Sequence, residues 1–358
     1  MSKLKKVVIG IGIVGVIGFI FAFDKIGLFL DGRKSTLNEQ NQDFFFDAKI
    51  GAEGLADQLV KEQLIDDKEA LLAVAKYKGL DVSNLASGKY IIEEGTSYRN
   101  LLNGFTLNSN GNGNAEVEVD VTFNNCKDIN QLAGKVSHCL SIDSAMLVSN
   151  IQSSATLDKF DFTLEQIPAL FLPNTYKMYY DTDEEQFINR MASEFKNFWT
   201  PERMSKIAKI GLKSPSQVVT LASIVYSEQS QNPEEWPIIA GLYLNRINQG
   251  IKMQSDPTFK FCWGDQLEGV QRLLAIHREI DCPYNTYKIN GLPPGPIYIP
   301  ATAVVDACLN RADVNYIYMC AKPDYTGKHN FAVSGDDHTR NATIFQNWLA
   351  NELKNKGQ

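Results

Sequence analysis

Apolar residues recur at helical spacing in several stretches of the chain and at alternate positions in others. Side chains on one helix face recur every three to four residues, and those on one strand face recur every two. Helical spacing predicts helices at residues 54–63, 68–78, 129–140, 143–152, 184–195, 201–210 and 301–310. Alternation and short apolar runs predict strands at residues 88–92, 117–123 and 316–321, so we expect an α+β protein.

Polar segments connect these elements in the first third of the chain. Residues 31–43 are polar and are expected to be a tether, whereas residues 108–114, rich in Asn and Gly, are expected to be a flexible connection. Thr96 is expected to cap a helix that contains Tyr98, because a threonine hydroxyl can accept the first free backbone N–H groups of a helix.

The amino terminus carries a long apolar run. Three lysines lie within the first six residues, and residues 7–23 that follow are uncharged. At roughly 1.5 Å per residue this run is about 26 Å long, and residues 26–30 would extend it enough to span a bilayer. A cleaved signal peptide is the alternative, but no small-residue cleavage site ends the run. Because the lysines favour a cytoplasmic start, we expect a single-pass inner-membrane anchor with the bulk of the chain on the periplasmic side.

A capping box opens the most strongly predicted helix. Ser214 is its N-cap, Pro215 occupies the first helical position, and Gln217 occupies the third. Apolar residues then recur at i, i+3, i+4 and i+7 and predict one buried stripe, made of Val218, Leu221, Ala222 and Val225.

Glu228 continues this apolar stripe. A carboxylate in such a position is partly desolvated, which raises its pKa and lets it donate a proton near neutral pH. The alternative is that the helix frays here and leaves Glu228 in water. Glu228 is therefore a candidate acid with a structural alternative.

A second helix is expected to start at Asn232 and Pro233 and to stop at Gly250, with Tyr243 on its apolar face, so that the two helices form a hairpin that frames a cleft. Residues 254–258 are predicted to be extended and rich in turns. Residues 291–296 contain three prolines and two glycines, which predict a rigid loop suited to a sugar-binding groove, or simply a stiff connector.

Composition narrows the classes of function. Of 358 residues, 44% are apolar, so the chain can bury a core and is not disordered as a whole. Thirty-five basic against 42 acidic residues give a net charge of −7, which argues against a general nucleic-acid binder. Four histidines and no Cys-x-x-Cys spacing argue against a metal site rich in histidine or thiolate.

Six cysteines allow fifteen pairings, and the sequence does not choose among them. Buried thiols are as consistent with the sequence as disulfides, and a catalytic thiol is not expected. His329 and His338 are expected to be structural, because neither has a nucleophile beside it in the sequence, and His338 is expected to lie just before the final helix.

Several motifs in the second half, read in order, resemble the MltG/YceG-like family of endolytic murein transglycosylases. The resemblance reaches from the anchor to near the C-terminus and is strongest over residues 214–331. The matching residues are Leu221-Ala222-Ser223-Ile224-Val225, Ile239-Ala240-Gly241, Leu244-Asn245-Arg246, Gln254 with Asp256-Pro257-Thr258, Tyr284-Asn285-Thr286-Tyr287, Gly291-Leu292-Pro293-Pro294, His329-Asn330-Phe331 and residues 171–176.

This resemblance implies an enzyme that cuts nascent glycan strands internally at MurNAc–GlcNAc β-1,4 bonds and leaves 1,6-anhydro-MurNAc ends. It implies no cofactor and no metal, and as partners it implies peptidoglycan strands, the membrane and peptidoglycan synthases. The implied organisation is an anchor (1–30), a tether (31–43), a LysM-like βα module (44–115) and an α+β catalytic domain of lytic-transglycosylase type (116–358).

One carboxyl group suffices for this chemistry, because the C6 hydroxyl of the substrate is the nucleophile. The resemblance places the family's catalytic glutamate at Tyr226 and a second glutamate at Glu228. Positions two apart on a helix differ by about 200°, so Glu228 is expected to act only through a bulge or a re-aimed helix end; otherwise the protein binds glycan without cutting it. The residues predicted to contact substrate are Tyr226, Gln254, Asp256, Thr258, Tyr284, Asn285, Thr286 and His329.

Overall fold

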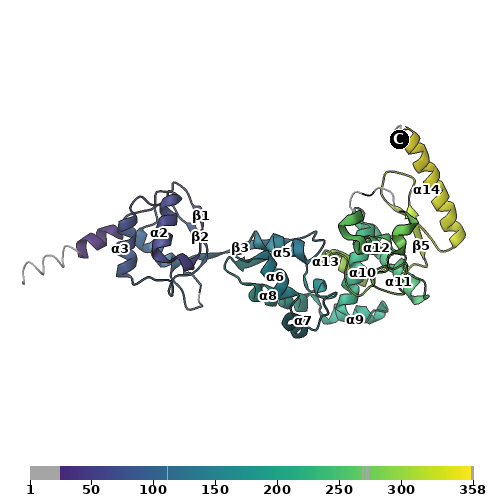
Figure 1. The fold of residues 1–358 in the computed structure, drawn as a ribbon, viewed down its shortest axis with the longest axis horizontal. Coiled ribbons are helices and arrows are strands. Elements are labelled where there is room, and N and C mark those ends of the chain that lie inside the picture. Colours follow the sequence, from purple (N-terminus) through teal and green to yellow (C-terminus); the bar gives the residue numbers. More distant parts are fainter. Residues whose placement is uncertain (1–24, 111, 268–269, 271–273, 356–358) are drawn as a thin grey trace, which may run out of the picture. The chain divides into compact units, whose positions relative to one another are not determined.

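The computed structural model describes residues 25–110, 112–267, 270 and 274–355, and they divide into two compact units. The first unit extends to Asp120 and includes residues 177–182, and the second contains the remaining residues from Val121 onward. Figure 1 labels the elements of both units. The anchor predicted at residues 7–23 lies outside the described residues, and none of the helices within the described part is long and apolar enough to cross a membrane.

After a helical segment at residues 25–31, the first unit contains a strand, two helices and a second strand. These are β1 (Gln42–Phe46), α2 (Gly51–Lys61), α3 (Lys68–Tyr77) and β2 (Gly88–Ile92), with the short 3₁₀ turn η1 (Ala48–Ile50) after β1, and α4 (Tyr98–Phe105) follows β2. β1 and β2 are antiparallel, with Phe44 opposite Tyr90. Phe44, Phe46 and Tyr90 each pack edge-on against Phe105, and this aromatic cluster joins the sheet to α4.

Two local predictions for the first unit differ from the structure. Ser97, rather than Thr96, caps α4, because the Ser97 hydroxyl accepts the N–H of Asn100 while the Thr96 hydroxyl donates to the carbonyl of Glu93. Residues 31–43, predicted to be a tether, pack against the unit: Thr36 is buried, and its N–H bonds to the carbonyl of Thr96. The sequence did not predict these contacts, because a polar composition says nothing about which backbone groups of a segment form hydrogen bonds.

Two further strands, β3 (Glu116–Phe123) and β4 (Asn174–Tyr179), complete a sheet with the order β1-β2-β3-β4. Asp120 pairs with Lys177 in the first unit, and the hydroxyls of Thr122 and Thr175 are 2.8 Å apart in the second. The division between the units therefore runs through this strand pair.

The second unit starts as a helical layer. Its elements are α5 (Ile129–Ser137), α6 (Ser144–Ile151), α7 (Ser154–Phe160), η2 (Ile167–Leu170), α8 (Glu184–Phe198) and α9 (Pro201–Lys209). α5 packs on α6, and α6 packs on α8. Asp183 caps α8 with a complete capping box, in which Gln186 bonds back to the N–H of Asp183.

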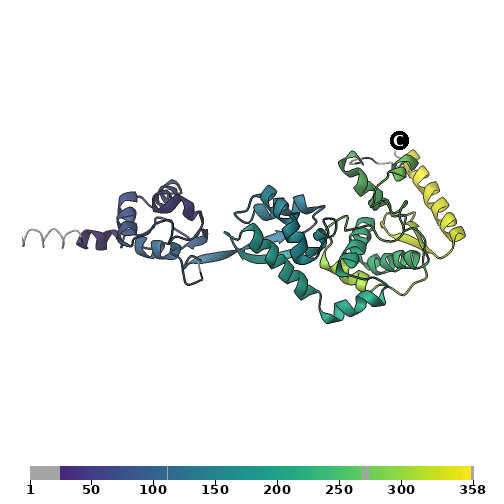
Figure 2. The same cartoon turned by 60° about the horizontal axis from the view of Figure 1, so that its bottom comes forward.

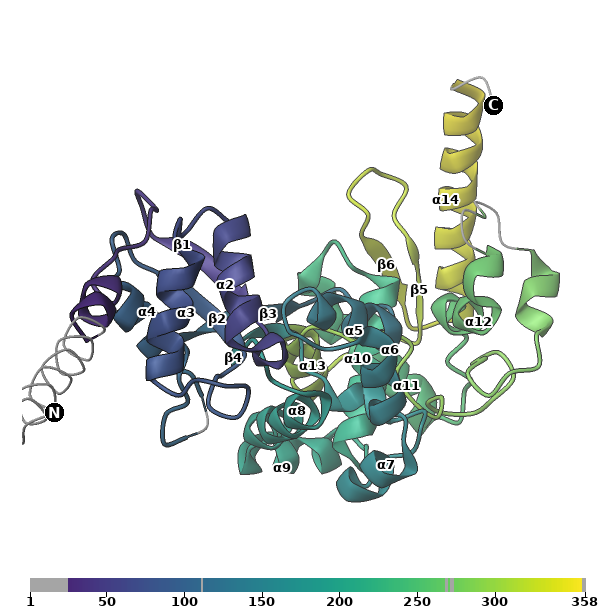
Figure 3. The same ribbon diagram turned by 60° about the vertical axis from the view of Figure 1, so that its left-hand side comes forward.

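The remaining elements carry the candidate site: α10 (Pro215–Glu228), η3 (Pro233–Glu235), α11 (Trp236–Asn248), α12 (Asp256–Trp263), η4 (Gly264–Leu267), η5 (Ala275–Glu279), α13 (Thr302–Leu309), β5 (Tyr318–Ala321), β6 (His329–Ala332) and α14 (Gly335–Asn355). β5 and β6 form an antiparallel hairpin, with Cys320 opposite Asn330. The yellow helix α14 packs against this hairpin and continues as a single helix (Figures 2 and 3).

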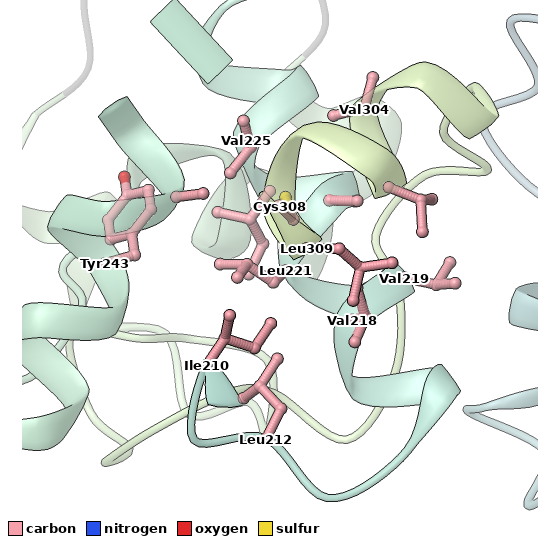
Figure 4. Close-up of a cluster of buried hydrophobic side chains, with 14 of the residues drawn as sticks. Ile210, Leu212, Val218, Val219, Leu221, Val225, Tyr243, Val304, Cys308 and Leu309 are labelled. Atoms are coloured by element: carbon pink, nitrogen blue, oxygen red, sulfur yellow. The ribbon is translucent and has the colours of Figure 1, made fainter. Parts of the chain in front are cut away.

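α10 is the central helix of this region. Its apolar residues pack against α11 and α13, and Leu221 and Val225 are fully buried beside Cys308 and Leu309 (Figure 4). Gly241 lets α11 approach the chain after α13, because a β-carbon there would lie 2.7 Å from the carbonyl oxygen of Ala312. The apolar stripe predicted for α10 is confirmed.

Three boundaries in this region differ from the predictions. Residues 254–258, predicted to be extended, instead include the start of α12 at Asp256; proline in a first helical turn is tolerated because the N–H it lacks would be unpaired there. α11 begins at Trp236 rather than near Asn232, since the 3₁₀ turn η3 intervenes. α14 begins at Gly335 and so contains His338, which was expected to precede it.

One disulfide, Cys262–Cys282, links α12 to the segment that follows η5, and the other four cysteines are free thiols. Cys126 and Cys308 are buried, and burial raises the pKa of both thiols. The structure thus combines one bridge with buried thiols, the two possibilities that the sequence left open.

Candidate active site

A cavity of about 630 Å³ lies in the second unit where α10, α11, the start of α12 and the β5–β6 hairpin meet. Glu228 lines it from the end of α10, Tyr243 and Arg246 from α11, and His329 from β6. Its polar lining is completed by Gln254, Asp256, Arg278, Tyr287, Tyr318 and His338. Residues far apart in the sequence therefore meet around one space.

Two hydroxyl groups hold the Glu228 carboxyl. The Tyr243 hydroxyl donates to Glu228 Oε1 at 2.6 Å, and the Ser255 hydroxyl donates to the same oxygen at 2.5 Å. Tyr243 and Ser255 are themselves buried. Among the described residues, no hydrogen-bond partner reaches Glu228 Oε2, so this oxygen is available to carry a proton.

Burial raises the pKa of Glu228, and the hydrogen bonds from Ser255 and Tyr243 act in the opposite direction. Removal of the carboxylate from water disfavours its charge, whereas donors to an oxygen favour the charged form. The group therefore holds a proton more readily than an exposed glutamate, and the two hydroxyls stabilise the carboxylate once that proton has left.

Tyr226 lies in different surroundings, although only two positions separate it from Glu228. Its ring stacks on Tyr298 at 4.9 Å, and its hydroxyl donates to the side-chain oxygen of Asn125 at 3.3 Å. α10 runs without a break from Pro215 to Glu228. The distortion expected from the sequence is therefore not required, because the cavity lies on the Glu228 side of an ordinary helix.

Buried hydroxyl and amide groups brace the wall that carries Ser255. The Ser255 N–H donates to the Thr286 hydroxyl at 3.0 Å, and the Thr286 and Thr258 hydroxyls are 2.8 Å apart. The Asn285 amide donates to the carbonyls of Arg278 and Ile280. All four residues, Ser255 included, are fully buried, so Thr258, Asn285 and Thr286 act on the cavity through the segment they hold.

Arg246, Asp256 and Arg278 are charged residues on the cavity walls beside Glu228. Arg246 is only 5% exposed; its guanidinium donates to the carbonyls of Lys252 and Ile317 and, at 2.6 Å, to Gln254 Oε1. Gln254 has a positive φ of 55°, a conformation that costs a non-glycine residue of order 1–3 kcal/mol, and the bond to Arg246 helps to hold it.

Asp256 is clamped from two sides. The Tyr287 hydroxyl donates to one of its oxygens at 2.5 Å, and the Arg278 guanidinium donates to the other at 3.3 Å. Burial, and then the bond to Asp256, raise the pKa of Tyr287. Asp256 thus lines the cavity and also ties the start of α12 to the segment after η5.

The predicted substrate contacts thus fall into three groups. Gln254, Asp256 and His329 line the cavity with Glu228, whereas Thr258, Asn285 and Thr286 are buried behind it. Tyr284 packs against Phe261 at 4.7 Å, and together with Tyr298 they line a second, smaller cavity of about 180 Å³. Tyr226 stacks on that same Tyr298.

Sequence reasoning missed Tyr243, Ser255, Arg246 and Glu235. Tyr243 was assigned only to the apolar face of its helix, although its hydroxyl is a polar tip within that face and lies at the edge of the labelled apolar cluster (Figure 4). Ser255 stands between two predicted site residues, Gln254 and Asp256, and that position was the available signal.

As an arrangement, the site offers one proton-bearing carboxyl, two hydroxyls that stabilise its anion, and a polar cavity with aromatic, amide and cationic walls. This set can protonate an oxygen of a bound polar molecule. The volume lies within the range of about 300–1,000 Å³ that is typical of small-molecule sites.

Comparison with known proteins agrees with this fold. The model of the YceG-like family matches residues 47–344. A relative from Streptococcus pneumoniae serotype 2 (strain D39), named endolytic murein transglycosylase, is 26% identical over 290 residues, which are 75% of this chain and 51% of the relative. A Bacillus subtilis (strain 168) protein of the same name is 25% identical over 283 residues, 75% of each chain.

The chain spans about half the length of the first curated relatives that it matches, from two strains of Streptococcus pneumoniae. The crystal structure of a YceG-like protein from Listeria monocytogenes superposes with a TM-score of 0.53 and 20% identity, covering 85% of this chain and 99% of that one. At this identity the likeness concerns the fold alone. Since the family model covers most of its length, the chain belongs to the YceG-like family.

Proposed function

We propose that the protein is an endolytic murein transglycosylase that cleaves MurNAc–GlcNAc β-1,4 bonds and leaves 1,6-anhydro-MurNAc ends. The observation that carries this proposal is the Glu228 carboxyl, which faces a sugar-sized cavity with one oxygen held by two hydroxyls. The names of the relatives from Streptococcus pneumoniae and Bacillus subtilis support the reaction class.

Glu228 is the acid of this reaction. Burial raises its pKa and so favours the protonated carboxyl, and this proton passes to the glycosidic oxygen as the bond to the anomeric carbon breaks. The Tyr243 and Ser255 hydroxyls then stabilise the carboxylate that forms. These donors lower the barrier because their bonds strengthen as negative charge develops on the carboxyl in the transition state.

The substrate supplies its own nucleophile, the C6 hydroxyl of the same MurNAc. A second carboxylate that attacks the sugar or activates water, as in two-carboxylate glycosidases, is therefore not required. In the route implied by the family resemblance, the Glu228 carboxylate also accepts the C6 hydroxyl proton.

Gln254, Asp256 and His329 are proposed to orient the sugar, since they line the cavity beside Glu228. Direct substrate contacts by Tyr226, Thr258, Tyr284, Asn285 and Thr286 stay predictions from the sequence.

We also propose that residues 7–23 anchor the chain in the inner membrane and that the catalytic unit works on its outer side. The Cys262–Cys282 disulfide supports an oxidising compartment, since such bridges are rare in the cytosol. Peptidoglycan synthases are the proposed partners there, and the first unit, with a core of its own, is the proposed LysM-like peptidoglycan-binding module. Protease digestion of spheroplasts, which reaches only the outer side, checks this orientation.

The function is tested by digesting purified peptidoglycan and identifying the products by mass spectrometry. Wild-type protein is expected to release 1,6-anhydro-muropeptides from within strands, and Glu228→Gln is expected to release at least about 100-fold less. Ser227→Ala is the matched control and should retain activity, because Ser227 is exposed on the same helix turn and its hydroxyl donates to the carbonyl of Ser223 in its own helix. Equal product from wild type and Glu228→Gln removes Glu228 from its role, and no product from wild type leaves a protein that binds glycan without cutting it.

A further inference from the structure

Glu235 is a buried carboxylate that the reaction above does not use. It is only 5% exposed and lies at the end of η3, in the second unit. Its Oε1 accepts the backbone N–H of His329 at 2.9 Å, and its Oε2 faces the His329 ring at 2.8 Å from Nδ1. The Gln229 amide donates to the same Oε2 at 2.9 Å.

These contacts fix the orientation and the tautomer of the His329 ring. Because a carboxylate only accepts hydrogen bonds, Nδ1 carries the proton, and Nε2 of the neutral ring is left as the acceptor. Gln229, which follows Glu228 directly, is itself held: its amide also donates to the carbonyl of Gly327 at 2.9 Å, and its side-chain oxygen accepts the N–H groups of Gln231 and Asn232. A half-buried imidazole at the cavity wall is thus anchored at one nitrogen.

His329 shares the cavity with Glu228, and a positive charge on His329 acts to lower the pKa of Glu228, against the larger opposite effect of burial. The two side chains reach this space from different elements, the end of α10 and β6. Glu235 lies behind the His329 ring, and Glu228 lines the same cavity. The other charged and titratable side chains on the cavity walls are Tyr243, Arg246, Asp256, Arg278, Tyr287, Tyr318, Cys320 and His338.

We propose that Glu235 and His329 form a second proton-transfer unit, in which His329 Nε2 accepts the C6 hydroxyl proton of the substrate. This rests on the proposed function. Glu228 gives its proton to the glycosidic oxygen, the bond from that oxygen to C1 breaks, and O6 forms the new bond to C1 while its proton passes to Nε2. The products are the anhydro end, the free hydroxyl, the Glu228 carboxylate and an imidazolium. Transfer of one proton from the imidazolium to Glu228 restores both groups.

The contacts of Glu235 and Glu228 both favour this proton transfer. The Glu235 carboxylate stabilises the imidazolium that forms, as a buried carboxylate does when it holds the histidine of a nucleophile-activating triad. Glu235 is a positioning residue, because it acts through His329. A separate acceptor also frees Glu228 from having to be the acid and then the base within one turnover, while two hydroxyl donors stabilise its anion.

The test is the pH dependence of kcat/KM for release of anhydro-muropeptides by the full chain. With a separate base, the wild-type profile is bell-shaped: Glu228 must be protonated, which gives the alkaline limb, and His329 must be neutral, which gives the acid limb. His329→Gln should lower kcat about 100-fold with a small change in KM and should remove the acid limb. Glu235→Gln should lower kcat about tenfold with a small change in KM, because the imidazolium that forms in the step loses its counter-charge.

His138→Gln is the matched control, since His138 is an exposed histidine at the end of α5 whose ring contacts only the carbonyl of Gly134 among the described residues. A wild-type profile without an acid limb overturns the inference without any variant. A His329→Gln protein that keeps the acid limb also overturns the inference. The same holds for a His329→Gln protein that loses thermal stability and activity while its pH profile stays unchanged. If wild type yields no anhydro product at any pH, the proposed function itself fails.

Discussion

The two sides of the last turn of α10 differ sharply in chemistry. On one side Tyr226 stacks on Tyr298, lies 6.5 Å from the ring of Trp236 and bonds to Asn125. On the other side Glu228 meets the hydroxyls of Tyr243 and Ser255 at the wall of the large cavity. Two residues of helical rotation separate an aromatic packing site from a site that can move a proton.

This difference shows that position on a helix, rather than the presence of a carboxylate nearby, decides which residue can act. A glutamate at 226 would face the rings of Tyr298 and Trp236, whereas a glutamate at 228 faces donors that stabilise its anion. The four predictions below test this contrast.

The largest expected effect comes from moving the carboxylate. In a Tyr226→Glu, Glu228→Gln double variant, activity should stay at the level of Glu228→Gln alone, at least about 100-fold below wild type. The reason is that residue 226 points about 200° away from the direction of residue 228. Anhydro-muropeptide release, measured with both single variants as controls, checks this. Activity restored to within tenfold of wild type would mean that the reaction uses the Tyr226 side.

Removal of the hydroxyl donors should have the next largest effect. Tyr243→Phe and Ser255→Ala should each lower kcat about 10- to 100-fold, because each leaves the Glu228 anion with one donor fewer. Both bonds lower the pKa of Glu228, so their loss should raise it further and move the alkaline limb of the rate profile to higher pH. Kinetics across pH check this, and an alkaline limb that moves to lower pH would contradict it.

The apolar framework around α10 was predictable because it depends on periodicity. Leu221 and Val225 recur at helical spacing and are fully buried, and Ser214 caps the helix with its hydroxyl as predicted. The candidate acid followed from the same stripe, since Glu228 continues it. These inferences need only local sequence.

The rest of the site could not be predicted in this way, because it depends on contacts between distant segments. Ser255 reaches Glu228 from 27 positions away, and His329 reaches Glu235 from 94. The motif that contains Thr258 was recognised, but its threonine proved to brace the fold from behind the cavity. A motif shows that residues matter together, and only the structure separates those that line a cavity from those that hold its wall.

The buried hydrogen bonds behind the cavity should affect the free energy of unfolding more than the rate of the reaction. Thr286→Val keeps the shape of the side chain but leaves the buried Ser255 N–H without its partner and removes one of the hydrogen bonds of the Thr258 hydroxyl, at a cost of about 1–3 kcal/mol in unfolding free energy. Denaturant unfolding measures this, and Thr302→Val, at the start of α13, is a matched control. If the two variants are equally stable, the bracing described for this wall is wrong.

The smallest effect concerns the cost of holding Glu228 in place. Its pKa is raised by burial in the folded protein, so the folded state binds more protons than the unfolded state between the unfolded value, about 4.3, and the folded one. Stability from this group is therefore lost as pH rises through that window and stays lost above it. Glu228→Gln should raise Tm by about 2–4 °C at pH 8 relative to wild type and by less at pH 4, where most unfolded chains also hold the proton. Tyr226→Phe, on the other side of the turn, should show a difference in Tm that does not depend on pH. An equal gain for Glu228→Gln at both pH values would mean that its charge is not strained in the fold, and the contrast between the two sides of α10 would then be one of shape alone.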